Sequence, residues 1–158
     1  MAAHALGMKI NYYQRNRVEK SIEKKVDAQY VPTLFELMEK SDFVSLHVPY
    51  GPPTEKMITY EVLSHMKPSA YFINTSRGGL VDENGLYKIL SEKKITAAAL
   101  DVYRWEPIPA DSPLSDSTTS SGQCTMQAEL LSSCWRRLTT CFRTLDGYLE
   151  EKNQKVGQ

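Results

Sequence analysis

An almost unbroken apolar segment, ITAAALDV at residues 95–102, constrains the fold of this chain more than any other feature. A strand without polar alternation is typical of a parallel sheet whose two faces are both covered by helices. Shorter apolar segments precede it, and helix-forming stretches lie between them. Repeated strand–helix units joined by short links predict a doubly wound α/β layer.

The expected element order follows from these apolar segments and from the helix-capping residues between them. Strands are predicted over residues 8–13, 43–48, 70–75 and 95–102. Helices are predicted to follow Thr33, Thr59 and Asp82, each of which can cap a helix N-terminus. Thr33 and Glu36 also form the Thr-x-x-Glu pattern of a capping box, which opens a helix to about Lys40. Residues 15–25 are basic and polar, and we expect a loop there.

Composition excludes several classes of partner. The 158 residues are 41% hydrophobic and 24% charged, with a formal net charge of zero. A neutral chain has no electrostatic attraction to nucleic acid or to an anionic membrane, so neither partner is expected. No apolar run could cross a bilayer and residues 1–10 do not resemble a secretory signal, so we expect a cytoplasmic protein. The three cysteines form no CxxC pair, which argues against a metal site.

Composition changes abruptly near residues 111–123. All eight prolines lie at or before residue 113, and all three cysteines lie after residue 123. The stretch between them is rich in Ser and Thr, as linkers and loops are. We therefore expect one domain over residues 1–114, and over residues 115–158 a divergent linker followed by an amphipathic C-terminal helix.

Ligands bind to doubly wound sheets at the loops that leave the carboxyl ends of the strands. One such loop, within NTSRGGLVDE at residues 74–83, places Arg77 at this edge of the sheet. Gly78 and Gly79 let the backbone turn tightly and approach a ligand. An arginine there can hold a carboxylate through two parallel hydrogen bonds. The alternative interpretation is an arginine that pairs with a helix end or an acidic neighbour.

The loop after the apolar strand carries two acids of interest. Asp101 stands at the end of that strand, where a charge is costly unless a ligand amide or a helix N-terminus satisfies it. Glu106 could orient a histidine. A solvated loop acid is the alternative interpretation of Glu106.

Three stretches follow one another in order: SDFVSLHVPYGPPTEKMI, MKPSAYFINTSRGGLVDENGLYKIL and KITAAALDVYRWEPIP. Together they resemble the D-isomer-specific 2-hydroxyacid dehydrogenases, with the glyoxylate/hydroxypyruvate reductases as the nearest subgroup, over roughly residues 2–114. The resemblance implies a Rossmann-like cofactor domain that uses NAD or NADP. It also implies reversible hydride transfer between the nicotinamide and a small 2-hydroxy or 2-oxo acid substrate.

The resemblance also assigns roles to single residues. Arg77 matches the arginine that binds the substrate carboxylate, and Glu106 matches the glutamate that holds the catalytic histidine. Asp101 matches the acid near the nicotinamide carboxamide. The other positions that match the cofactor-lining loops are Val48, Pro49, Thr54 and Thr75.

The loop after the first expected strand bears on the choice of cofactor. It contains Gln14, Arg15 and Arg17, and many relatives carry an aspartate for the ribose hydroxyls at the position of Gln14. Replacing that acid and adding two arginines suits a 2′-phosphate, which favours NADP over NAD. A solvated basic loop explains these residues equally well, since further lysines follow.

Two features of the family are absent from this sequence. There is no phosphate-binding G-x-G-x-x-G, and the opening MAAHALGMKI matches the end of the helix that follows it. The expected sheet is therefore incomplete, without its first strand and glycine turn. No Pro-His-x-Gly turn follows Glu106. We interpret the three histidines, His4, His47 and His65, as structural.

Three functional hypotheses follow. The first is an NAD(P)-binding domain of an oxidoreductase that is inactive by itself. The second is a non-catalytic cofactor-binding or interaction protein, which forms a homodimer or pairs with a full-length relative. The third is a truncated gene product without independent function, which would unfold with little cooperativity and aggregate.

Overall fold

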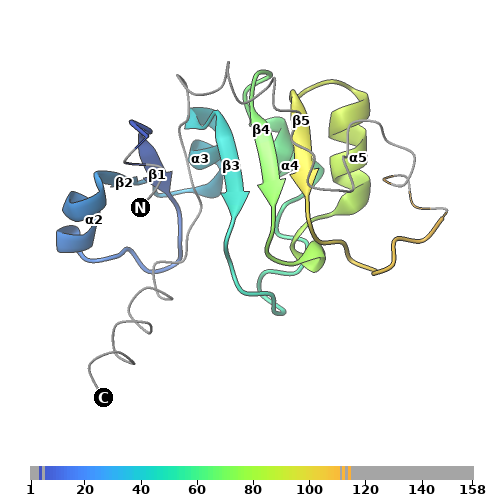
Figure 1. Cartoon of the computed structure of the whole chain (residues 1–158), viewed down its shortest axis with the longest axis horizontal. Coiled ribbons are helices and arrows are strands. Elements are labelled where there is room, and N and C mark those ends of the chain that lie inside the picture. The colour runs from blue at the N-terminus through green and yellow to red at the C-terminus, as the bar shows by residue number, and fades with distance from the viewer. Residues whose placement is uncertain (1–3, 5, 111, 113, 115–158) are drawn as a thin grey trace.

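The computed structural model describes residues 4, 6–110, 112 and 114, and they form two parallel sheets (Figure 1). The strands are β1 (Ile10–Tyr12), β2 (Ala28–Tyr30), β3 (Phe43–Leu46), β4 (Tyr71–Asn74) and β5 (Ala97–Leu100). β1 pairs with β2, and the other three form a sheet in the order β3-β4-β5. The linker and C-terminal helix expected at 115–158 lie outside the described residues.

A helix connects each described strand to the next. The helices are α2 (Lys20–Val26), α3 (Leu34–Lys40), α4 (Tyr60–Ser64) and α5 (Glu83–Ser91). Because parallel strands need such crossovers, this order confirms the predicted α/β class with parallel, Rossmann-like sheets.

The prediction of a loop over residues 15–25 is wrong, because α2 begins at Lys20. Its sequence, KSIEKKV, has little apolar periodicity, and one of its two buried positions is a charged residue, Glu23. β2 was not predicted either, since its three residues, AQY, make no apolar run. Both elements depend on contacts made across the fold, which a local pattern does not display.

The predicted helix caps are confirmed in part. Thr33 accepts a hydrogen bond from the Glu36 amide at 3.2 Å, and Thr59 caps α4 in the same way. The Glu36 carboxylate pairs with Lys40, so the capping box is only half formed. Asp82 precedes α5 as predicted, but its side chain makes no capping hydrogen bond.

Burial alternates along the three-stranded sheet. One face of each strand is buried, and the other is only half-buried. Burial of β5 on both faces is therefore not observed, because α4 and α5 pack their apolar side chains on one face. The buried side chains of that core include Val44, Leu46, Val62, Leu63, Phe72, Leu86, Ile89, Leu90 and Leu100.

The two sheets are joined by a small apolar contact. Val31 and Leu37 form a second buried cluster, and Leu34 and Val48 pack against both this cluster and the main core. No strand ladder connects β1 with β3 in the described part of the chain. The described strands thus form two separate parallel sheets.

Candidate functional site

The turn after β4 is rigidly built and fixes the backbone of Arg77. Asn74 is buried, with 1% of its surface exposed, and its Oδ1 accepts a hydrogen bond from the Ser76 amide at 3.1 Å. Its Nδ2 donates to the Arg77 carbonyl at 3.0 Å. Ser76 Oγ donates to the carbonyl of Leu46, at the end of the neighbouring strand, at 2.7 Å. An Asx turn of this kind replaces the missing backbone hydrogen bonds where the chain leaves a strand.

Arg77 presents its guanidinium to solvent at this edge. Its one hydrogen bond within the described residues runs from an Nη atom to the carbonyl of Ser76 at 2.6 Å. No carboxylate of the described residues pairs with it, so the alternative of an acidic neighbour is not observed there. The rest of the guanidinium fork is available to an anionic ligand.

Gly78 brings the loop after β5 against the turn after β4. A Cβ atom at Gly78 would lie 1.9 Å from the carbonyl carbon of Tyr103, so only glycine permits this approach. The Arg104 amide donates to Glu83 Oε1 at 2.7 Å. The Arg104 guanidinium contacts Glu55 at 3.3 Å. The loops after β3, β4 and β5 are therefore tied together at one edge of the sheet.

The two acids of the loop after β5 are placed differently from each other. Glu106 Oε1 accepts a hydrogen bond from the Tyr103 amide at 3.0 Å, and no histidine of the described residues bonds to it. Asp101 is exposed, so the expectation of a costly charge at a buried strand end is wrong. Its own amide donates to the carbonyl of Asn74 at 3.0 Å.

The loop after β3 closes on itself through Thr54. The Thr54 hydroxyl accepts from the Gly51 amide at 3.0 Å and lies 2.8 Å from the Pro49 carbonyl, to which it donates. Val48 is half-buried between the two apolar clusters, whereas Thr75 of the next loop is exposed. Thr54 and Val48 thus hold the shape of the loop after β3. Pro49 of this loop and Thr75 of the loop after β4 are exposed at the surface.

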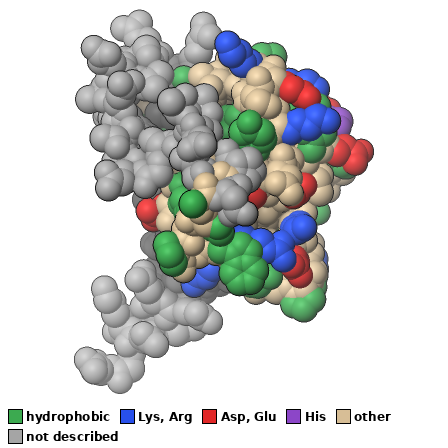
Figure 2. Space-filling model, turned by 90° about the vertical axis from the view of Figure 1, so that its right-hand side faces the viewer, with side chains coloured by type: hydrophobic (Ala, Val, Ile, Leu, Met, Phe, Trp, Pro, Cys, Tyr) green, Lys and Arg blue, Asp and Glu red, His purple; other side chains and the backbone are tan. Residues whose placement is uncertain are grey.

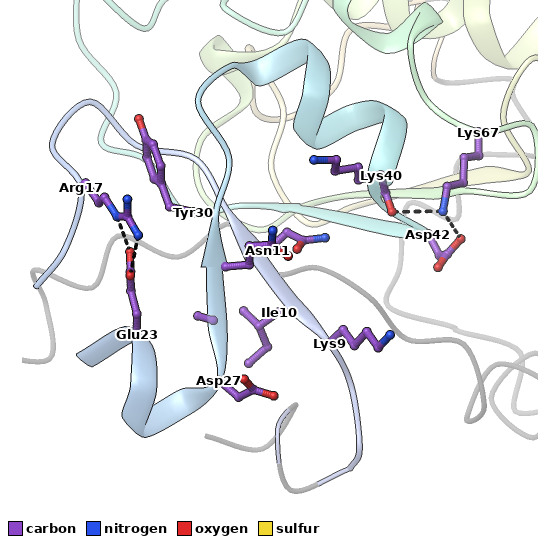
Figure 3. Close-up of a pocket in the computed structure, with 12 residues that line it drawn as sticks. Lys9, Ile10, Asn11, Arg17, Glu23, Asp27, Tyr30, Lys40, Asp42 and Lys67 are labelled. Carbon is purple, nitrogen blue, oxygen red and sulfur yellow. Dashed lines mark hydrogen bonds and ion pairs between the residues drawn. The ribbon is translucent and has the colours of Figure 1, made fainter. Parts of the chain in front are cut away.

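The loop after β1 contains two arginines. Arg17 forms an ion pair with Glu23, whereas Arg15 forms none with the described residues. Both Glu23 oxygens accept hydrogen bonds from Arg17, at 2.7 and 2.8 Å (Figure 3). Tyr12 donates to Glu23 Oε1 at 2.5 Å. Arg15 is exposed and makes no ion pair with the described residues. Gln14 Oε1 is buried and has no hydrogen-bond partner among the described residues.

These contacts shift the pKa values of the groups involved. The hydrogen bonds from Arg17 hold the pKa of Glu23 at about 2, well below its usual 4.5. Burial, and next the hydrogen bond to Glu23, raise the pKa of Tyr12 to about 12. Glu23 is therefore an anion, and Tyr12 a neutral donor, throughout the physiological range.

A hollow of about 810 Å³ lies between the two-stranded sheet and the chain that enters β3 (Figure 3). Asn11, Tyr30, Asp42 and Lys67 are among its lining residues, and Arg77, Asp101 and Glu106 are not. It is therefore separate from the edge formed by the loops after β3, β4 and β5, although Arg17 of the loop after β1 also lines it. Figure 2 shows hydrophobic side chains beside Lys, Arg, Asp and Glu side chains at the lower end of the described surface.

Sequence reasoning missed several residues that build this edge. Asn74 and Ser76 lie inside the NTSRGG stretch but were not singled out, although Asn followed two residues later by Ser is a turn signal. Glu83 and Glu23 had no local signal, because their partners lie in other loops. Within the described residues, no helix could span a membrane, and no three His, Cys, Asp or Glu side chains could together hold a metal ion.

The sequence of this chain is similar to those of known proteins. Residues 1–124 match the family described as D-isomer specific 2-hydroxyacid dehydrogenase, NAD binding domain. A glyoxylate reductase of Korarchaeum cryptofilum is 51% identical over 112 residues, which are 71% of this chain and 33% of that protein. The chain thus spans about a third of the length of this curated relative.

Solved structures agree with the sequence match. The apo form of Rhodotorula graminis D-mandelate dehydrogenase superposes with a TM-score of 0.70 at 34% identity, over 75% of this chain and 34% of that chain. An NADPH-dependent glyoxylate/hydroxypyruvate reductase from Sinorhizobium meliloti, in complex with NADP and malonate, gives 0.68 at 32% identity. That alignment covers 76% of this chain and 36% of that chain.

Proposed function

The chain belongs to the D-isomer specific 2-hydroxyacid dehydrogenase family through its NAD binding domain, and we propose that it binds NADP(H) along the carboxyl edge of its strands. In a longer protein of this family, the same edge would serve the reduction of a small 2-oxo acid such as glyoxylate or hydroxypyruvate. The observation that carries the proposal is the exposed guanidinium of Arg77, which forms no ion pair with the described residues and stands on a hydrogen-bonded turn beside the acid-bearing loop after β5.

Arg77 is proposed to hold the carboxylate of the substrate. Its backbone is fixed by Asn74, so the guanidinium can bind without first ordering the turn. A planar guanidinium matches a carboxylate with two parallel hydrogen bonds, and Arg77 has no competing acid among the described residues. The Sinorhizobium meliloti relative was solved with malonate, which carries two carboxylates of the kind this arginine would bind.

The loop after β1 supports the dinucleotide part of the proposal. Gln14 offers a buried acceptor oxygen that has no partner among the described residues, which suits a ribose hydroxyl. Arg15 offers an exposed cation one residue away, which suits a 2′-phosphate. The other residues proposed to line the cofactor are Val48, Pro49, Thr54, Thr75 and Asp101. The bound nicotinamide would supply hydride transfer.

We propose that this chain by itself binds without turnover. Glu106 has a backbone amide as its hydrogen-bond partner, whereas His65 pairs with Glu39 and His47 with Ser45. No acid–base group is therefore held next to Arg77 within the described residues. A non-catalytic binding module, alone or paired with a second copy or a longer relative, is the second candidate that this observation favours.

Thermal unfolding with added ligands tests the proposal. Millimolar NADPH should raise the melting temperature, because only the folded chain binds it. The rise with NADH should be smaller, because NADH lacks the 2′-phosphate that Arg15 is proposed to bind. Malonate should stabilise the wild type and lose its effect in Arg77→Gln, while the NADPH shift survives that substitution. Equal protection by malonate in both proteins would contradict the role of Arg77. No shift with either nucleotide would contradict cofactor binding.

A further inference from the structure

The loop of residues 13–19, which follows β1, is pinned by three side chains that we call the Glu23 cluster: Tyr12, Arg17 and Glu23. The Tyr12 hydroxyl donates to Glu23 at 2.5 Å and accepts from the Val18 amide at 3.3 Å. Tyr12 is 2% exposed and Glu23 is 9% exposed, so both polar groups lie within the fold. The loop is thus attached to β1 at Val18 and to α2 at Arg17.

Arg17 has its hydrogen-bonding fork already occupied. Its Nε and one Nη atom each reach one Glu23 oxygen, which is the two-point geometry that carboxylates and guanidinium groups share. The guanidinium carbon lies 5.2 Å from the centre of the Tyr30 ring (Figure 3). Moving Arg17 to another anion would leave the buried Glu23 carboxylate without its main partner, which is unfavourable.

Gln14 and Arg15 differ from Arg17 in this respect. Gln14 Nε2 donates to the Asn16 carbonyl at 2.5 Å, which turns the loop back on itself and leaves Oε1 without a partner among the described residues. Arg15 is exposed and has no bond within the described part of the chain. These two side chains, and not Arg17, are the ones that the loop offers to a ligand.

We propose that Arg17 is a positioning residue: through Glu23 and Tyr12 it holds the loop of residues 13–19 so that Gln14 and Arg15 meet the adenosine ribose of the dinucleotide. This inference rests on the proposed cofactor binding. It assigns the preference for NADP(H) to Arg15 alone, although the sequence carries two arginines in this loop. It differs from the expectation that Arg17 itself binds the cofactor.

Glu23→Gln separates the two roles of Arg17, because they predict opposite signs. In the variant one carboxylate oxygen becomes an amide donor, so the fork is broken and the guanidinium is released. If Arg17 positions the loop, the Kd values for NADPH and NADH both rise, by roughly tenfold for one lost charged hydrogen bond. If Arg17 were a phosphate ligand, its release would tighten NADPH binding and leave NADH unchanged, and the inference would be overturned.

Two further variants complete the set of Kd measurements. Arg15→Gln should weaken NADPH by roughly tenfold and leave NADH within about twofold, because only the 2′-phosphate is lost as a partner. Glu92→Gln is the matched control, since Glu92 also accepts from a tyrosine and a lysine but lies on the surface, at 34% side-chain exposure. It should change neither Kd. A loss of NADPH binding in Glu92→Gln equal to that in Glu23→Gln would also contradict the inference.

Limited trypsin digestion tests whether the loop is ordered, independently of cofactor binding. Arg15 and Arg17 are both cleavage sites within the loop of residues 13–19. Glu23→Gln should be cut there at least several-fold faster than the wild type and Glu92→Gln, with mass spectrometry locating the first cut. Unchanged cleavage would overturn the positioning role even if both nucleotides bind. Faster cleavage with no nucleotide binding by the wild type would contradict the proposed function and leave the Glu23 cluster supported.

Discussion

The two sheets of this protein are held together by different physical interactions. The three-stranded sheet and its helices α4 and α5 share one continuous apolar core, in which Phe72, Leu86 and Ile89 are fully buried. The unit β1–α2–β2 lacks such a core. The small apolar cluster next to it consists of Val31, which follows β2, and Leu37 of α3, and its own best-connected buried groups are the polar ones of Tyr12 and Glu23.

This difference separates the proposed substrate edge from the proposed cofactor loop. Apolar burial stabilises the first sheet in proportion to area and depends little on pH. An ion pair between a buried carboxylate and a half-exposed guanidinium, with one tyrosine donor, depends on the charge of its members and on their geometry. We therefore expect the loop that is proposed to select the dinucleotide to belong to the less stable part of the fold, from which binding loops are often drawn.

The largest expected effect comes from opening the apolar core. Phe72→Ala should destabilise the chain by about 3–5 kcal/mol, because a fully buried aromatic ring leaves a cavity. Urea unfolding followed by circular dichroism measures this loss. Trp105→Ala is the control, since that ring is 66% exposed, and it should cost less than about 0.5 kcal/mol. Equal costs for both variants would contradict the placement of the core.

A smaller effect is expected where the loops after β4 and β5 meet. Gly78→Ala should cost about 1–3 kcal/mol, because its Cβ would overlap the backbone of Tyr103 and Arg104. Gly51→Ala is the matched control, since the nearest atom lies 3.8 Å from the added Cβ, and it should be close to neutral. The Gly78 variant should also lose malonate protection. Retained protection would show that Arg77 does not depend on this contact.

The smallest effect is a local response of the two-stranded unit to pH. The folded pKa of Glu23 is lowered to about 2 from 4.5, so its contribution is complete above pH 4.5 and is lost as pH falls towards 2. The folded pKa of Tyr12 is raised to about 12 from 10, so its contribution is lost as pH rises from 10 to 12.

Hydrogen exchange measured residue by residue checks this response. Between pH 4.5 and pH 3, protection factors of the β1 and β2 amides should fall several-fold more than those of β4 and β5, after correction for intrinsic exchange. Glu23→Gln should abolish the difference between the two sheets. A uniform fall across all strands would contradict the distinction between an apolar and a charged region.

The two elements that the sequence did not predict, α2 and β2, both belong to the β1–α2–β2 unit. Strands β3 to β5, and the capping of α3 and α4 by threonine, were predicted because apolar runs and capping residues are local signals. The helix α2 was missed because Glu23 is buried through contacts with Arg17 and Tyr12, and a sequence of lysines and glutamates predicts a solvated loop. Charge pairing across loops leaves no periodic pattern.

The site shows the same limit. The glycine pair after Arg77 indicated a close backbone approach, and the structure has that approach at Gly78. The partner of Arg17 could not be predicted, because nothing in the order of residues distinguishes a free arginine from a bound one. We expected Asp101 to need a partner because it stands at the end of an apolar segment. The strand β5 ends at Leu100, one residue before Asp101, and Asp101 is exposed.

The most direct test of the central claim is an amide NMR titration of the chain with NADPH. The claim is that the loops leaving both sheets form one cofactor edge. The account predicts that amides of residues 14–18, after β1, and 75–79, after β4, shift together with one Kd, while those around Glu92 on the surface do not move. Shifts confined to one sheet, or centred on exposed lysines, would contradict it.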